Sequence, residues 1–168
     1  ILLVNLVSYF ALLRAFFIGM NLNKKEITEK IKEIIEDLGY LFIEIDFRGD
    51  SRNYILEIYI DNEIGITTVN CSDVSKAIGE MLETSNLIES RYRLDVSSPG
   101  TDRPLKFIQQ FKKNVGRNFE LIIENATSSK ISGELLEVNS DDLKFKIEKE
   151  IKEINIKNIK SAKVLIRF

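Results

Sequence analysis

The stretch LDVSSPGTDRPL, residues 94–105, separates two parts of the chain that have different patterns of apolar residues. Its Ser-Pro-Gly core predicts a tight type II turn, because Pro99 fixes φ and Gly100 tolerates a positive φ. A turn of this kind between unlike patterns is typical of a connection between domains. We therefore expect a short linker at residues 99–104.

The rest of this linker motif is explained by helix-start chemistry except at one position. Thr101 or Asp102 can cap a following helix, and Pro104 suits its first turn. That leaves Arg103, whose guanidinium can pair with Asp102 or Asp95 and brace the two parts, or bind a phosphate or a partner's carboxylate. We favour an ion pair of Arg103 that braces the two parts over binding of a phosphate or a partner's carboxylate, because turn chemistry already explains most of the segment. The linker motif comprises Ser97, Ser98, Pro99, Gly100, Asp102, Arg103 and Pro104.

Upstream of the linker, the periodicity predicts the order α-β-β-α-β. Apolar residues at helical spacing begin after Asn23 and stop at Gly39, and a second such stripe runs from about residue 67 to Asn86. Strands are expected at 41–47, 55–60 and 92–97, where apolar and polar residues alternate. We expect both helices on one face of the sheet, burying Leu41, Ile43, Ile45 and Phe47 of the first strand. The other face is a candidate protein-docking face, or merely solvated, and carries Glu44, Glu57, Tyr59 and Arg93.

Downstream of the linker, the pattern changes to short strands. A helix at 105–114 is expected first, and strands then follow near 119–124, 131–138, 143–148, 153–156 and 162–168. Five short strands within about fifty residues are typical of a small SH3-like or Sm-like β-barrel. The fold class is therefore α+β, with a two-layer N-terminal domain at 20–98 and a C-terminal barrel at 105–168.

Residues 1–19 are nearly all apolar, apart from Asn5, Ser8 and Arg14. Three interpretations are open: a membrane helix, a signal peptide, or an over-extended start upstream of Met20. Arg14 is costly in a membrane span, and a basic n-region is missing. We favour the over-extended start over an anchor and leave residues 1–19 out of the fold.

Composition removes most familiar catalytic and metal centres. The 168 residues contain no His and one cysteine, Cys71, which excludes disulfide frameworks, Cys/His zinc sites and His-dependent triads. Carboxylate pairs such as Asp61 with Glu63 could bind a divalent ion or transfer protons, but no nucleophile or Gly-rich phosphate loop accompanies them. We expect no catalytic residue, no metal, no cofactor and no small-molecule substrate.

Charge is distributed unequally along the chain. Residues 21–100 hold 9 basic and 16 acidic side chains, whereas residues 101–168 hold 14 basic and 10 acidic ones. An acidic part joined to a basic part suggests two kinds of partner, such as a basic protein and a phosphate backbone. Uneven solvated surface is the alternative.

The segment YRLDVSSPGTDRPL followed by QQFKKNVGRNFEL resembles the signature of the bacterial RimP ribosome maturation factors, with Asp95 where Glu is commoner in that family. Gly65-Ile66-Thr67 and the closing NIKSAKV of residues 158–164 are also similar, so the resemblance covers about residues 21–168. It implies an α+β N-terminal domain and an Sm-like C-terminal barrel. It also implies a non-enzymatic cytoplasmic factor that binds the small (30S) ribosomal subunit late in its assembly.

The resemblance further implies two partners, ribosomal RNA and a basic ribosomal protein near the decoding centre. On this hypothesis the acidic part binds the protein, and the basic part, as a monomer, approaches RNA through Lys112, Lys113, Arg117 and Lys130. For Lys112 and Lys113 the alternative is a favourable position near a helix C-terminus. An Sm-like RNA-binding regulator acting off the ribosome and a membrane-tethered adaptor are the other function classes.

Overall fold

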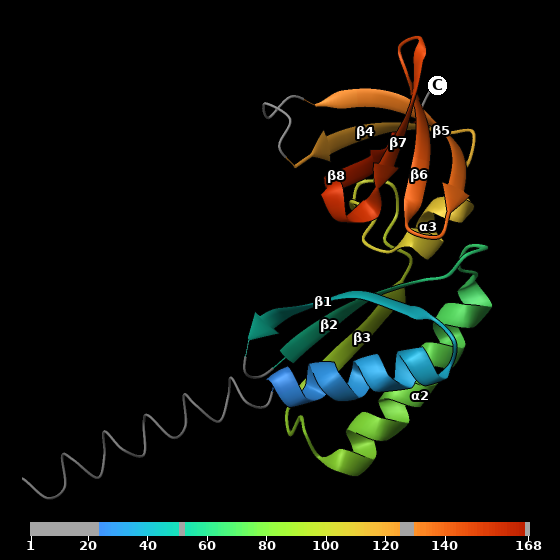
Figure 1. Ribbon diagram of the computed structural model, residues 1–168. Coiled ribbons are helices and arrows are strands. Elements are labelled where there is room, and N and C mark those ends of the chain that lie inside the picture. The colour runs from blue at the N-terminus through green and yellow to red at the C-terminus, as the bar shows by residue number, and fades with distance from the viewer. Residues whose placement is uncertain (1–23, 51–52, 125–129, 167–168) are drawn as a thin grey trace, which may run out of the picture.

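The chain forms two sheets, one on each side of the linker, in the computed structural model, which describes residues 24–50, 53–124 and 130–166 (Figure 1). The first sheet belongs to the N-terminal half, residues 24–97, and the second to the C-terminal half, residues 105–166. The predicted α+β class is confirmed. The apolar segment 1–19 lies outside the described residues. None of the described helices is long and apolar enough to cross a bilayer.

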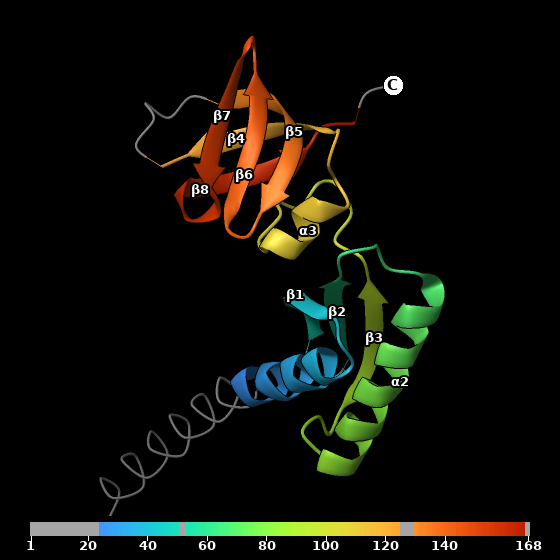
Figure 2. The ribbon, with the colours of Figure 1, turned by 45° about the vertical axis from the view of Figure 1, so that its right-hand side comes forward.

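The N-terminal half packs two helices on one face of a three-stranded sheet (Figures 1 and 2). In this sheet β1 and β2 are antiparallel, whereas β2 and β3 are parallel. The parallel pair needs a crossover, which α2 supplies. The elements are a helix at residues 24–37, β1 (Leu41–Asp50), β2 (Asn53–Asp61), α2 (Thr68–Ser85) and β3 (Arg91–Ser97).

Aliphatic side chains from both helices and from the central strand form the core of this half. Leu56, Ile58 and Ile60 of β2 are fully buried against the two helical stripes. Burial of each such side chain stabilises the fold by about 1.5–3 kcal/mol. The helical stripes are Ile27, Ile31 and Ile35 on one helix and Val74, Ile78 and Leu82 on α2.

A β-bulge in β1 changes which of its residues face the helices. Phe42 pairs with Ile60 and Glu44 with Tyr59, so Ile43 is an extra residue without an opposite partner. The bulge moves Phe42 to the helix-covered side, where Ile45 and Phe47 also pack. The expectation that Leu41 and Ile43 share that side is therefore wrong, because strict alternation holds only in an unbroken ladder.

The C-terminal half is a five-stranded antiparallel sheet with the strand order β7-β6-β5-β4-β8. In Figures 1 and 2 the strands β5, β6 and β7 cross in front of β4 and β8. The expected closed barrel is not confirmed, because β7 and β8 are the two edges and no pairing joins them within the described ranges. The elements are α3 (Ile108–Lys112), β4 (Asn118–Ile123), β5 (Ile131–Asn139), β6 (Asp142–Ile147), β7 (Glu150–Asn155), a 3-10 turn at Ile156–Asn158 and β8 (Ile159–Val164).

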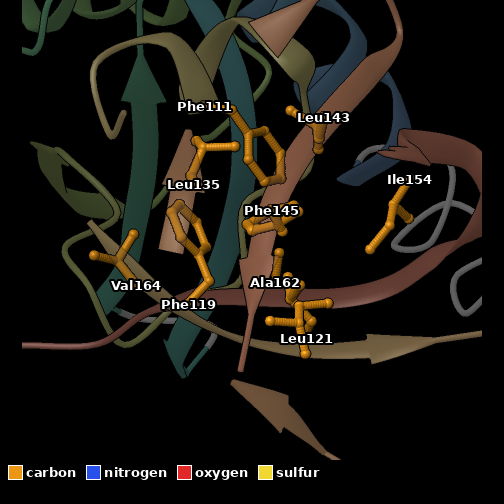
Figure 3. Packing of buried hydrophobic residues seen from close by; sticks show 10 residues of the cluster. Phe111, Phe119, Leu121, Leu135, Leu143, Phe145, Ile154, Ala162 and Val164 are labelled. Atoms are coloured by element: carbon orange, nitrogen blue, oxygen red, sulfur yellow. The ribbon is translucent and has the colours of Figure 1, made fainter. Parts of the chain in front are cut away.

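Three phenylalanines organise the core of the C-terminal half (Figure 3). Phe119 stacks on Phe111 and meets Phe145 edge-on, with ring centroids 5.6 Å apart in both pairs. Such aromatic pairs contribute about 0.5–1.5 kcal/mol beyond their buried area. Since Phe111 belongs to α3, this packing fixes the short helix against the sheet.

The helix expected at 105–114 is shorter, spanning only Ile108–Lys112. Leu105 remains outside the helix because its N–H donates to the carbonyl of Ala162 in β8, 2.8 Å away. The Gln110 side chain then accepts from the N–H groups of Lys106 and Phe107, at 2.8 and 3.1 Å. Tertiary and capping contacts therefore set the helix start, not the Asp102–Pro104 signal.

Candidate functional site

The linker turn follows directly after β3. Gly100 has φ +67°, which is the left-handed conformation that a type II turn needs at its third residue, so this part of the turn prediction is confirmed. Ser98 and Gly100 are exposed, and Pro99 is half-buried. The turn leads the chain back over the end of the first sheet, where Arg103 meets β1 and β2.

Arg103 is bound to the first sheet by three contacts. Its guanidinium lies 3.7 Å from the ring centroid of Tyr59 and 3.2 Å from Asp46 Oδ2. Glu44 Oε2 is 3.6 Å away. The contact with Tyr59, reinforced by the charges of Glu44 and Asp46, raises the pKa of Arg103. The predicted partners Asp102 and Asp95 are wrong, because strands brought together by the fold offer closer carboxylates.

Lys106 completes this group, which we call the linker cluster: Glu44, Asp46, Tyr59, Arg103 and Lys106. The Lys106 ammonium donates to the carbonyl of Ile43 at 3.1 Å and to Glu44 at 3.3 Å. The bulge makes the Ile43 carbonyl available, because bulged residues are left out of the ladder. The four charged side chains are between 26% and 46% exposed, so solvent screens these pairs.

The open face of the first sheet carries a row of three carboxylates. Asp46, Glu57 and Asp95 are neighbours across β1, β2 and β3. Each pairs with a different arginine, in the order Arg103, Arg48 and Arg93, at 3.2, 3.1 and 2.7 Å. Of the candidate docking residues, Glu44 and Tyr59 belong to the linker cluster and are covered by Arg103 and Lys106. Glu57 and Arg93 lie on the part of the face that these two side chains leave uncovered.

A second group joins the halves, and we call it the buried cluster: Asp61, Gln110 and Lys113. Asp61 at the end of β2 is 2% exposed and Gln110 is fully buried. Gln110 Nε2 donates to Asp61 Oδ2 at 2.8 Å, and the Lys113 ammonium donates to Asp61 Oδ1 and to the carbonyl of Asn62. The Asn62 N–H also donates to Asp61 Oδ1, so the buried carboxylate is fully hydrogen-bonded.

The four candidate RNA-contact residues are in different environments. Lys113 pairs with Asp61, and Lys112 pairs with Glu63 at 2.8 Å, so both contact the N-terminal half. Lys130 pairs with Glu120 at 3.0 Å within its own sheet. Arg117 is exposed, and its side chain has no hydrogen bond or ion pair within the described part of the chain.

Asp61 and Glu63, considered above as a carboxylate pair for a metal or for acid–base chemistry, each bind a lysine instead. No group of three potential metal ligands occurs among residues 24–50, 53–124 and 130–166. Sequence reasoning missed Gln110 and the interface role of Asp61, since the partners lie 49 and 52 positions apart. The one available signal was a carboxylate at the last position of the apolar strand β2.

Cys71 lies in the first turn of α2 and is half-buried. Burial raises the pKa of its thiol, which lowers the fraction of reactive thiolate at neutral pH. The position therefore favours a structural thiol.

A cavity of about 330 Å³ lies beside the buried cluster. The loop between β2 and α2, the linker turn and the segment after α3 all contribute to its wall. Its polar lining includes Ser98, Thr101, Lys113, Asn114 and Arg117. The cavity is therefore built from both halves and from the linker.

The N-terminal half matches a known protein family. Residues 30–102 match the family model of the RimP N-terminal domain, from the first helix through the linker turn. The matched region contains the second half of the first helix, α2 and the three strands of the first sheet, together with Asp61 and the carboxylate row. This match over residues 30–102 supports the RimP ribosome maturation factor family, the same family that the linker motif resembles.

Proposed function

We propose that this chain is a non-catalytic maturation factor that binds the small ribosomal subunit in the cytoplasm and assists its late assembly. The match of residues 30–102 to the RimP N-terminal domain carries this proposal. The division of charge supports it, because the acidic half and the basic half suit a basic protein and an RNA backbone respectively. In this proposal the factor acts as a monomer.

The uncovered part of the first sheet is the proposed docking face for a basic ribosomal protein. Glu57 and Asp95 lie there side by side, and Arg48 and Arg93 pair with them at its surface. Exposed ion pairs of this kind contribute little to stability, so a partner's lysines or arginines can replace them at low cost. Specificity for a basic partner would come from the carboxylate row.

The contacts between the two halves divide the four candidate RNA-contact residues into two sets. Arg117 and Lys130 are the proposed RNA contacts, with Lys112, whose side chain is 51% exposed, beside them. Lys113 belongs to the buried cluster, where Asp61 already neutralises its charge, so it adds only its third N–H group as a hydrogen-bond donor to an RNA contact.

We propose further that the two halves are domains at 20–98 and 105–168, joined by residues 99–104. Separate hydrophobic clusters in the two halves support this division. On this proposal the five-stranded sheet is the Sm-like module of the family. Its strands would follow an SH3-like arrangement in which the sheet stays open between the edge strands β7 and β8.

Co-sedimentation with purified small subunits, large subunits and joined ribosomes tests the function. We expect binding to free small subunits only, weakened in Arg117→Glu/Lys130→Glu and little changed in Lys25→Glu/Lys76→Glu, which alters net charge equally on the N-terminal half. The first pair should also reduce the salt dependence of binding, because phosphate contacts release counterions.

Other outcomes would contradict the proposal. Binding to free RNA without preference for a subunit favours an Sm-like regulator acting off the ribosome. Pelleting with membranes, lost in a chain begun at Met20, favours the tethered adaptor.

A further inference from the structure

The cavity beside the buried cluster has one uncompensated charge. Its charged lining residues are Asp61, Lys113 and Arg117. Asp61 accepts from three donors and pairs with Lys113, so these two groups neutralise each other. Arg117 has no acidic partner in the described segments, and its guanidinium offers five N–H donors. The cavity is therefore suited to an anion.

Further donors surround the same space. Ser98 and Thr101 line the cavity, and their hydroxyls make no hydrogen bond within the described ranges, so both are available as donors. Lys113 uses two of its three N–H groups, on Asp61 and Asn62, and keeps one. A guanidinium, an ammonium and two hydroxyls are the groups with which proteins bind phosphate oxygens.

The other residues of the cavity wall are apolar, and they indicate what kind of molecule carries the anion. Ile66, Leu105 and Val164 contribute to the lining, and Ile64 at the same cavity is 90% exposed. A free hydrated ion gains nothing from such a wall, whereas a sugar or base attached to the phosphate does. The volume of about 330 Å³ is at the lower end of the range of roughly 300–1,000 Å³ for ligand pockets.

We propose that this cavity binds one phosphate group of an RNA strand, with Arg117 as the principal ligand and Ser98, Thr101 and Lys113 as further donors. The inference rests on the proposed function and gives it a location between the halves. Since the walls come from both halves and the linker, a bound strand would also hold the halves in one orientation.

Titration of the full chain with a single-stranded hexauridylate tests the site, with sodium phosphate and a hexaglutamate peptide as parallel probes. We expect hexauridylate to shift the amide resonances of Gly65, Gly100, Thr101 and Arg117. Arg117→Gln should weaken its binding about tenfold, equal to losing one charged contact. The slope of log affinity against log salt should fall by about 0.7, as expected for one phosphate contact on a single strand.

Arg91→Gln is the matched control, because it removes the same charge at the start of β3, the end of that strand away from the cavity, and Arg91 is exposed like Arg117. Equal weakening by Arg91→Gln and Arg117→Gln would overturn the site, since non-specific attraction would then explain binding. Shifts confined to other residues would do the same, as would saturation by sodium phosphate alone. Binding of hexaglutamate as tight as that of hexauridylate would assign the cavity to carboxylates and reject RNA.

Failure of the site can be separated from failure of the proposed function. If the unmodified chain sediments with small subunits but hexauridylate does not reach the cavity, only the site is rejected. If hexauridylate binds at the cavity and the chain ignores every ribosomal particle, the maturation function is rejected and the site stands.

Discussion

The buried cluster and the linker cluster connect the same two halves with similar chemical groups in different surroundings. In the buried cluster, Asp61 and Gln110 are shielded from water and their buried side-chain polar atoms have hydrogen-bond partners. In the linker cluster, Arg103 and Lys106 reach across solvent-exposed carboxylates. Charge pairs are costly to leave unpaired where water cannot reach them, and nearly neutral where it can.

This contrast indicates different roles in positioning the halves. A buried carboxylate accepts only orientations in which Lys113 and Gln110 both reach it, so the buried cluster specifies one arrangement. The linker cluster tolerates several orientations of the two halves, because its charged side chains can exchange protein partners for water. We expect the relative orientation of the halves to depend on Asp61, Gln110 and Lys113 far more than on Arg103.

Lys113→Met should have the largest effect. It leaves the Asp61 carboxylate buried without its counter-ion, and loss of one partner of a buried pair costs about 3–5 kcal/mol. Each half has its own core, so the chain can avoid this cost by opening at the cluster. Residual dipolar couplings should fit one alignment tensor for both halves in the unmodified chain and two in the variant.

A double variant supplies the control for this prediction. Asp61→Asn/Lys113→Met removes both charges, while the single carbonyl oxygen of Asn can still accept from Gln110 Nε2. Its couplings should return to a single tensor. A common tensor in Lys113→Met alone, with unchanged unfolding free energy, would mean that the cluster does not set the orientation.

Gln110→Ala should have an intermediate effect. It removes a donor to Asp61 and the acceptor for the N–H groups of Lys106 and Phe107. Leaving such groups unsatisfied costs about 1–3 kcal/mol, measurable by urea unfolding. Gln109→Ala in the same short helix makes no comparable change and should stay within about 0.5 kcal/mol. Equal losses in the two variants would show that helix α3 is merely weakened by alanine.

Most of the fold could be predicted because its signals are local. The alternation of apolar and polar residues in β2 and the apolar stripes of the two N-terminal helices predict that Leu56, Ile58 and Ile60 pack under the helices, as they do. The errors arose where a distant contact overrides the local pattern. The bulge at Ile43 shifts one strand face, and the bond from Leu105 to Ala162 delays the start of α3.

The candidate site was less predictable for the same reason. Bracing by Arg103 follows from turn chemistry, but its partners Asp46 and Glu44 lie on a strand more than fifty residues earlier. Lys112 and Lys113 appear in the sequence as a free basic pair, and only the folded chain places carboxylates against them. Charge alone does not distinguish a ligand-binding lysine from one neutralised within the protein.

Arg103→Lys should have the smallest effect and the most specific signature. Lysine keeps the charge near Asp46 and Glu44 but loses the planar stacking on Tyr59, a contact that contributes about 0.5–1 kcal/mol at exposed sites. At 1 M salt, where the screening length is about 3 Å, the loss should persist, because stacking is not an ion pair. Arg93→Lys, at a guanidinium that pairs with Asp95 and with no aromatic ring among the described residues, should show a smaller loss that salt abolishes. In a double-mutant cycle with Tyr59→Leu, the Arg103→Lys cost should vanish once the ring is gone, and a cost that remains would assign Arg103 to ion pairing alone.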